Sequence, residues 1–225
     1  MIIEKQNTPL VSVILCVYNR KDILERALNS VIKQTFKDYE LIIVDDGSTD
    51  EVEKLIFPYL KKHQNFKYIR HSNCGLPLSR NKGILIAQGQ YITFIDSDDE
   101  YKKEHLEQMV FFMKENPDVD LIHSSCEVIG NEDDMWLVDA RDKTKLIHIK
   151  DCVVGPTFFG KKEVFIEMDG FKELSYAEDF DFYNRLISSG KFKIHKLNEK
   201  TYIYYRNVKN SITNSVKKAC ANPDF

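Results

Sequence analysis

The sequence predicts an α/β fold in which a mostly parallel, Rossmann-like sheet with some mixed pairing is flanked by helices. Short apolar runs alternate with amphipathic segments through the first half of the chain, which is the pattern of successive strand–helix units. The 225 residues are 43% hydrophobic and 30% charged, and no Pro/Gly/Ser-rich linker divides them. One domain over residues 1–225 with a single core of moderate size is therefore expected.

The first two strand–helix units are the most regular. Residues 10–17 form an apolar, β-branched run, and residues 23–32 carry apolar side chains on one helical face. A second apolar run follows at residues 39–44. Beyond an Asp-Asp-Gly turn, Ser48 and Glu51 have the spacing of a capping box, which predicts the start of the second helix.

The third unit repeats this order. Residues 66–70 predict a third strand, and Pro77 suits the first turn of the helix that follows, where a missing N–H is tolerated. We expect that helix to run through Ala87 and to end before Gly89. Residues 91–95 then predict a fourth strand.

The second half of the chain is less regular. An amphipathic helix is predicted over residues 106–113 and a strand over residues 119–129. Residues 155–156, Gly-Pro, precede a Phe-rich segment to which no element is assigned. A helix is predicted to begin at residues 178–179, and a late strand lies at residues 202–205.

Charge and hydropathy exclude two classes of protein. The net charge is −3 and the longest Lys/Arg runs are pairs, so no concentrated basic surface for nucleic acid is expected. No stretch reaches the roughly 20 apolar residues that span a bilayer, and the amino terminus does not resemble a signal peptide. We expect a cytoplasmic protein. The five cysteines form no C-x-x-C pair and are expected to be reduced and mostly buried.

Polar residues follow three of the predicted strands. The first strand ends at Tyr18-Asn19-Arg20, the second at Asp45-Asp46, and the fourth at residues 96–99, Asp-Ser-Asp-Asp. Ligands of parallel sheets bind at the carboxyl ends of the strands. The three loops are therefore expected to converge on one crevice.

The Asp-Ser-Asp-Asp segment has two interpretations. Three carboxylates within four residues repel each other unless a cation or solvent compensates them, and oxygen ligands without His or Cys suit Mg²⁺ or Mn²⁺. The alternative is a solvated acidic turn. An EF-hand calcium loop is rejected because Tyr101 stands where that loop needs glycine. A haloacid-dehalogenase-like phosphatase, with Asp96 as nucleophile, is a weaker enzymatic alternative.

Two further acidic pairs also have alternatives. In residues 45–48, Asp-Asp-Gly-Ser, one Asp could stabilise its own turn or accept a hydrogen bond from the ring N–H of uracil, thymine or guanine. Neither glycine-rich phosphate motif occurs in the chain. Glu178-Asp179 could complement a helix dipole, or an ionised Asp there could act as a general base.

In combination, these segments resemble the family 2 glycosyltransferases, which are inverting enzymes of the GT-A fold that use nucleotide sugars. The resemblance covers nearly all of residues 10–99 and a shorter segment downstream. The matching segments are VSVILCVYNR, SVIKQTFKDYELIIVDDGSTD, NCGLPLSRNKGILIAQGQYITFIDSDD and YAEDFDFYNRL. Residues 10–99 would then be the nucleotide-sugar half and residues 100–225 the acceptor and catalytic-base half.

The resemblance also implies roles for individual residues. Asp46 would contact the base, with Asp45 as the alternative, and Asp179 would be the catalytic base. Asp98, together with Asp96, would hold a divalent ion, Mn²⁺ or Mg²⁺. Other residues would line the nucleotide pocket, namely Cys16, Val17, Tyr18, Asn19, Arg80, Asp96 and Ser97. A loop over the diphosphate or the acceptor would include Glu178, Arg206 and Ser211.

The function implied is the transfer of one sugar from a nucleotide-diphosphate sugar, UDP-linked in the first instance, to a glycan or lipid-linked acceptor. The resemblance points to bacterial surface-polysaccharide synthesis, at the inner face of the cell membrane if the protein associates with it peripherally. The Q-x-x-R-W motif of processive synthases is missing around Trp136, so a non-processive enzyme is expected. The alternative function is that of a non-catalytic nucleotide-sugar-binding module. The sequence contains no heptad repeat that would indicate an oligomeric state.

Overall fold

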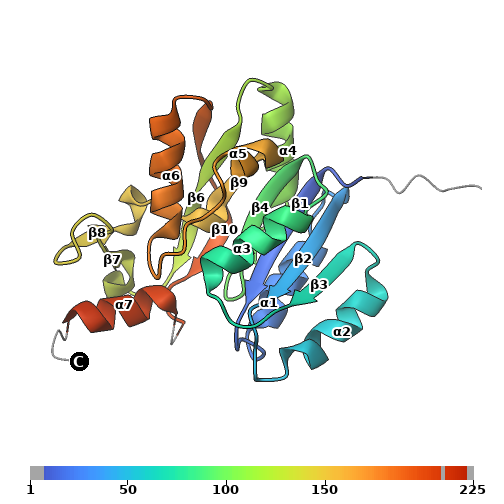
Figure 1. Ribbon diagram of the computed structural model, residues 1–225, viewed down its shortest axis with the longest axis horizontal. Coiled ribbons are helices and arrows are strands. Elements are labelled where there is room, and N and C mark those ends of the chain that lie inside the picture. Colours follow the sequence, from blue (N-terminus) through green and yellow to red (C-terminus); the bar gives the residue numbers. More distant parts are fainter. Residues whose placement is uncertain (1–7, 209–210, 222–225) are drawn as a thin grey trace, which may run out of the picture.

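One eight-stranded sheet forms the centre of the computed structural model (Figure 1), with the strand order β3-β2-β1-β4-β9-β6-β10-β5. The structure describes residues 8–208 and 211–221, so the outermost residues of the domain expected over 1–225 lie outside the described part. This curled, mostly parallel mixed sheet confirms the predicted α/β class.

The first four strands form the parallel part of the sheet. They are β1 (Val11–Val17), β2 (Tyr39–Asp45), β3 (Phe66–Arg70) and β4 (Tyr91–Asp96). β1 pairs in parallel with both β2 and β4, and β2 pairs with β3. All four lie where the apolar runs predicted them, and β1 and β2 are buried along their whole length.

The other half of the sheet is mixed. β9 (Phe158–Lys161) is antiparallel to both β4 and β6 (Leu121–Ile129). β10 (Ile194–Tyr205) pairs in parallel with β6 and antiparallel with β5 (Glu100–Tyr101). The Phe-rich segment is therefore an interior strand, and the late strand is longer than the sequence pattern indicated. A separate hairpin-like pair joins β7 (Trp136–Val138) to β8 (Leu146–His148).

Helices cover both faces of the sheet and make a three-layer structure (Figure 1). On one face lie α1 (Leu24–Ile32), α2 (Val52–Lys62) and α4 (His105–Glu115). The opposite face packs against α3 (Leu76–Ile86), α5 (Lys162–Glu167) and α6 (Glu178–Ser189). The last helix, α7 (Ile212–Ala221), lies beside β7.

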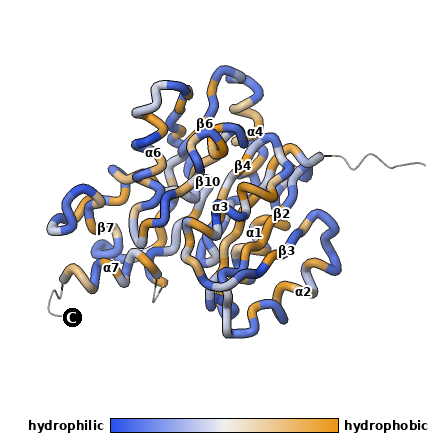
Figure 2. The backbone as a smooth tube through the Cα atoms, in the orientation of Figure 1, coloured by the Kyte–Doolittle hydropathy of each residue, from blue (hydrophilic) through white to orange (hydrophobic). Residues whose placement is uncertain are grey.

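β1 contributes apolar side chains to both faces of the sheet. Val13 and Leu15 belong to the core beneath α1, whereas Ile14 and Cys16 belong to the core beneath α3, because successive strand residues point to opposite faces. In Figure 2 the hydrophobic colour gathers in these central strands.

The predicted capping box at the start of α2 is wrong. Glu51 adopts a left-handed conformation (φ 60°) and makes no side-chain cap, and Asp50 Oδ1 accepts from the N–H of Val52 at 3.2 Å instead. The hydroxyl of Ser48 accepts from the N–H of Asn19 at 3.0 Å. Ser48 therefore links the loops after β1 and β2 and does not cap the helix. Among the described helices, none combines the length and apolar character that a membrane crossing requires.

Candidate active site

A cavity of about 660 Å³ opens at the carboxyl ends of β1, β2 and β4, and residues of α6, the β7–β8 region and α7 complete its wall. The three loops predicted to converge on one crevice all reach it. The lining includes most of the predicted site residues, namely Cys16, Val17, Tyr18, Asp46, Arg80, Asp96, Ser97, Asp98, Glu178, Asp179 and Ser211.

The two acids after β2 have different environments. Asp45 is fully buried and does not line the cavity, since its carboxylate accepts from Ser48 N at 2.8 Å and from the hydroxyl of Tyr68 at 2.7 Å. Asp46 lines the cavity. Its carboxylate accepts from Cys74 N at 2.7 Å and Gly75 N at 2.9 Å. Of the two, only Asp46 can contact a bound nucleotide.

Two other predicted residues lie outside the cavity lining. Asn19 accepts from Thr49 N at 2.7 Å through its side-chain oxygen, so it joins the loops that follow β1 and β2 and does not line the cavity. Arg206 is 1% exposed and donates to the backbone oxygen of Asp134 and to the side chain of Asn214, each at 3.1 Å. Arg206 therefore links the end of β10 to Asn214 of α7.

The acids after β4 divide into a cavity pair and a structural acid. Asp96 and Asp98 line the cavity. Burial, followed by the charge of Asp96, raises the pKa of Asp98 to about 6, and the nearby charge of Arg20 opposes this shift. A carboxylate whose ionisation is disfavoured by a neighbouring carboxylate gains most from a cation. The pair therefore suits a divalent cation with oxygen ligands.

Asp99 is the structural acid of the segment. It is fully buried, accepts from the hydroxyl of Tyr202 at 2.5 Å and accepts from Tyr205 N at 2.8 Å. The hydroxyl oxygen of Tyr202 also accepts from Asp96 N at 3.3 Å. Burial raises the pKa of Asp99 well above its ordinary value. This acid attaches the acidic loop to β10 and does not line the cavity.

Arg80 connects the two halves of the site. Its side chain is 2% exposed and donates to Asp96 Oδ1 at 2.9 Å and to Glu178 Oε1 at 2.7 Å. Burial and the charge of Asp179 raise the pKa of Glu178 to about 7, although the Arg80 guanidinium acts in the opposite direction. A buried guanidinium between two carboxylates holds the end of β4 and the start of α6 at a fixed separation.

Asp179 lies in the first turn of α6, as predicted. Its Oδ2 accepts from Gly155 N at 2.8 Å, and its Oδ1 accepts from Phe180 N at 2.8 Å. A Cβ atom at Gly155 would lie 2.8 Å from Asp179 Cβ, so a side chain there would displace the acid. Burial raises the pKa of Asp179. A carboxylate of raised pKa that faces a cavity is suited to accept a proton.

Some cavity residues were not assigned to the site from the sequence. Arg20 lines the cavity beside Asp98, and its position directly after Asn19 was the only signal for it. Asn73 and Ser79 also line the cavity. The wall formed by residues 137–141 and 151–154 had no recognisable motif, because its side chains reach the cavity only through the irregular fold of the second half.

Comparisons with known proteins agree on one family. A family model described as "Glycosyl transferase family 2" matches residues 12–169. An uncharacterised glycosyltransferase of Methanocaldococcus jannaschii is 30% identical over 202 residues, which cover 85% of this chain and 70% of that protein. TuaG of Bacillus subtilis, a glycosyltransferase assigned provisionally to teichuronic acid biosynthesis, is 32% identical over 222 residues, covering 94% of this chain and 84% of TuaG.

Solved structures share the fold. The crystal structure of S. aureus TarS in complex with UDP-GlcNAc matches with a TM-score of 0.72 and 25% identity, over 91% of this chain and 60% of that one. The mannosyltransferase PcManGT from Pyrobaculum calidifontis, in complex with GDP-Man and Mn²⁺, matches with a TM-score of 0.70 and 17% identity, over 93% of this chain and 60% of its own. The chain thus spans about 60% of the length of each of these two structures.

Proposed function

The chain belongs to glycosyl transferase family 2, and from this premise we propose a metal-dependent, inverting enzyme that transfers one sugar from a nucleotide-diphosphate sugar to a hydroxyl group. The observation that carries the proposal is one cavity that brings Asp46, Asp98 and Asp179 together from three distant segments. The family assignment replaces the phosphatase alternative.

The nucleotide is proposed to bind over the carboxyl ends of β1 and β2. Asp46 lies on this wall of the cavity together with Val17 and Tyr18, and a carboxylate can accept from the ring N–H of uracil. A UDP-linked donor is favoured because TarS, the similar structure at 25% identity, was solved with UDP-GlcNAc. The nucleotide-sugar half is proposed to be residues 10–99, and the acceptor and base half residues 100–225.

The residues after β4 fit a divalent ion, since two carboxylates lie on the cavity and the pKa of Asp98 is raised to about 6 by burial and by Asp96. Asp98 would hold the ion, with Asp96 as the second ligand, and Mn²⁺ or Mg²⁺ suits these oxygen donors. Such an ion would supply Lewis acidity that offsets charge on the departing diphosphate. Arg80 keeps Asp96 in place through its 2.9 Å ion pair.

Asp179 is proposed to be the general base. It would take a proton from the acceptor hydroxyl as that oxygen bonds to the anomeric carbon, while the bond to the nucleotide diphosphate breaks on the opposite face. A single displacement inverts the anomeric centre, and no covalent enzyme intermediate is needed. Gly155 N–H orients the Asp179 carboxylate through its 2.8 Å hydrogen bond. The neighbouring carboxylate of Glu178 is engaged in its ion pair with Arg80.

The acceptor is proposed to be a glycan or a glycolipid of a bacterial cell surface, modified on the cytoplasmic side of the membrane by non-processive addition. The support is the 32% identity with TuaG. The acceptor would enter beside the wall of residues 137–141 and 151–154 and beside Ser211, all of which line the cavity.

A stereochemical assay tests this function. The full chain is incubated with Mn²⁺, one of several UDP-, GDP- and dTDP-sugars, and a panel of glycan and glycolipid acceptors, and proton NMR follows the anomeric configuration. Transfer with inversion is expected for one donor class. Transfer with retention would contradict the single-displacement mechanism. Donor binding without transfer to any acceptor would favour the non-catalytic binding module.

A further inference from the structure

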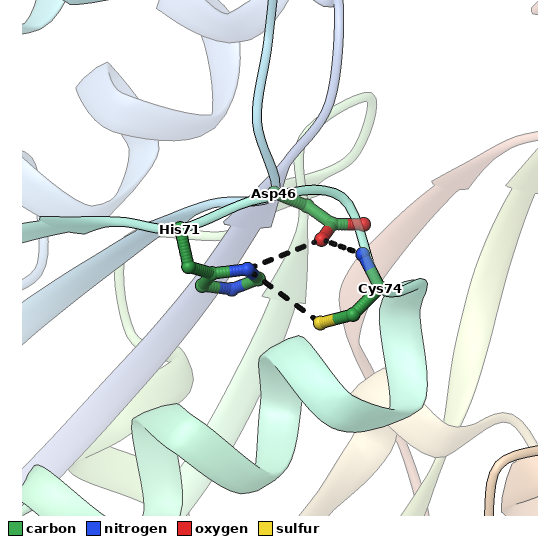
Figure 3. A group of neighbouring side chains, drawn as sticks. All are labelled: Asp46, His71 and Cys74. Atoms are coloured by element: carbon green, nitrogen blue, oxygen red, sulfur yellow. Dashed lines mark hydrogen bonds and ion pairs between the residues drawn. The ribbon is translucent and has the colours of Figure 1, made fainter.

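A second group of metal-ligand side chains includes Asp46 of the cavity lining and two residues that do not line the cavity. Asp46, His71 and Cys74 place one carboxylate oxygen, one ring nitrogen and one sulfur within 4.8 Å of one another (Figure 3). Asp46 follows β2, and the other two belong to the loop between β3 and α3. The nucleotide-sugar reaction proposed above uses Asp46 as the base contact but neither His71 nor Cys74.

Two of the separations match the edges of a zinc coordination tetrahedron. His71 Nδ1 lies 3.4 Å from Asp46 Oδ1 and 3.5 Å from Cys74 Sγ. With ordinary zinc–ligand bond lengths, tetrahedral geometry places nitrogen about 3.4 Å from oxygen and about 3.6 Å from sulfur. The ring nitrogen is therefore placed to share one ion with either of the other two donors, and all three donor atoms lie within 4.8 Å of one another.

The surrounding groups hold two of the ligands in place. His71 Nε2 lies 3.3 Å from the hydroxyl of Ser79, which is fully buried. Metal-bound histidines characteristically donate their second N–H in this way. Asp46 Oδ1 accepts from Cys74 N at 2.7 Å, so the carboxylate ligand is fixed to the same loop that carries the thiol.

Two further polar groups contact the proposed ligands. Lys82 Nζ donates to Cys74 Sγ at 3.4 Å, so a cationic side chain lies beside the sulfur. His71 Nδ1 also lies 2.8 Å from the carbonyl oxygen of Ser72, and an ion bound to this nitrogen would take the place of that contact.

We propose that Asp46, His71 and Cys74 bind one zinc-class divalent ion, with a water molecule as the fourth ligand. The mixed carboxylate, imidazole and thiolate set selects Zn²⁺ or Co²⁺ over Mg²⁺, which prefers oxygen ligands. This site is separate from the Asp96–Asp98 pair. Because Asp46 and Gly75 line the cavity, the ion would fix one wall of it.

Cobalt spectroscopy on the full chain tests the site. Titration with Co²⁺ is expected to produce a sulfur-to-cobalt charge-transfer band whose intensity saturates at one equivalent of Co²⁺. Zn²⁺ is expected to abolish the band, and excess Mg²⁺ is expected to leave it unchanged. Cys74→Ser is expected to lose the band. The matched control Cys152→Ser removes another partly buried thiol of the cavity and is expected to keep it, as is Asp98→Asn.

Two further variants make the result independent of a folding defect in Cys74→Ser. His71→Gln retains the thiol and is expected to weaken Zn²⁺ binding at least tenfold, and Ser79→Ala, which acts through His71, is expected to weaken it about tenfold. The proposal is overturned if the wild type gives no band, if Cys74→Ser keeps it, or if Cys152→Ser loses it. The two proposals share Asp46, but none of these results depends on nucleotide binding, so failure of this proposal is distinguishable from failure of the glycosyltransferase proposal.

Discussion

Arg80 donates a hydrogen bond to Glu178 at 2.7 Å across 98 residues of sequence. The same guanidinium donates to Asp96 at 2.9 Å. One buried cation therefore links the acidic loop after β4 with the helix that carries Asp179. The distance between the proposed ion-binding and proton-accepting ends of the cavity depends on this side chain.

Arg80→Met is expected to lower the free energy of unfolding by about 3–5 kcal/mol, because it leaves the carboxylates of Asp96 and Glu178 without their buried partner. Denaturation with urea measures the change. Lys54→Met is the matched control, since its ion pair with Glu51 is exposed and its loss is expected to have no measurable effect. Equal stability of the two variants would show that the Arg80 ion pairs do not hold the site together.

Asp179→Asn is expected to lower kcat by about 10²–10⁴-fold, because an amide cannot accept the acceptor's proton. Nucleotide affinity is expected to change less than about twofold, since the amide oxygen can still accept from Gly155 N–H. Release of nucleoside diphosphate measures kcat, and calorimetry measures binding. Asp181→Asn, on the same helix and paired with Arg185, is the control. An Asp179→Asn variant with normal kcat would exclude Asp179 as the base.

Tyr202→Phe is expected to lower the free energy of unfolding by about 1–3 kcal/mol, because buried Asp99 loses a hydrogen-bond donor at 2.5 Å. Mn²⁺ affinity is expected to fall as well, since the Tyr202 hydroxyl also accepts from Asp96 N. Thermal unfolding and manganese titration test both effects. Tyr205→Phe removes a less buried hydroxyl that donates to Glu100 at 3.2 Å, and the same loss in this variant would contradict the special role of Tyr202.

Acid is expected to destabilise the protein in part through His105. Burial lowers the pKa of His105 from 6.5 to about 3, and its ring nitrogen Nε2 is buried without a hydrogen-bond partner among the described residues. The unfolded chain therefore binds a proton that the folded chain does not. The stability that the neutral His105 ring contributes is fully present above the pKa of the unfolded chain and is lost as the pH falls toward about 3.

The slope for this histidine is about 1.4 kcal/mol per pH unit below the unfolded pKa. His105→Asn is expected to remove that slope from a series of urea denaturations between about pH 4.5 and about pH 6. His195→Asn changes an exposed ring and is expected to leave the slope unaltered. An unchanged slope in His105→Asn would show that the ring is protonated at little cost in the folded state.

The parallel half of the fold was predictable because each of its strands is buried on both faces. β1 and β2 appear in the sequence as continuous apolar runs, and parallel topology then places the ends of these strands at one edge. The cavity residues that directly follow a strand, such as Asp46 and Asp98, could be found by this reasoning alone.

Residues held by tertiary contacts could not be assigned in this way. Asp45 and Asp46 are adjacent and identical in type, and their different environments depend on donors distant in sequence. The hydroxyl of Tyr68 donates to buried Asp45, whereas Gly75 N donates to Asp46 at the cavity. Asp99 likewise is distinguished from Asp98 by its hydrogen bond from Tyr202. β9 was missed because a short strand of four residues that is buried on both sides carries no periodic signal.

Calorimetric titration of UDP into the full chain, with and without Mn²⁺ and with Asp98→Ala in parallel, tests the central claim most directly; GDP, dTDP and ADP serve as comparison ligands. We expect one nucleoside diphosphate, UDP in the first instance, to bind in a manganese-dependent manner, and Asp98→Ala to lose that dependence while keeping the wild-type circular dichroism spectrum. Equal affinity with and without Mn²⁺, or equal affinity in wild type and Asp98→Ala, would contradict a metal-dependent nucleotide-sugar site built on Asp98.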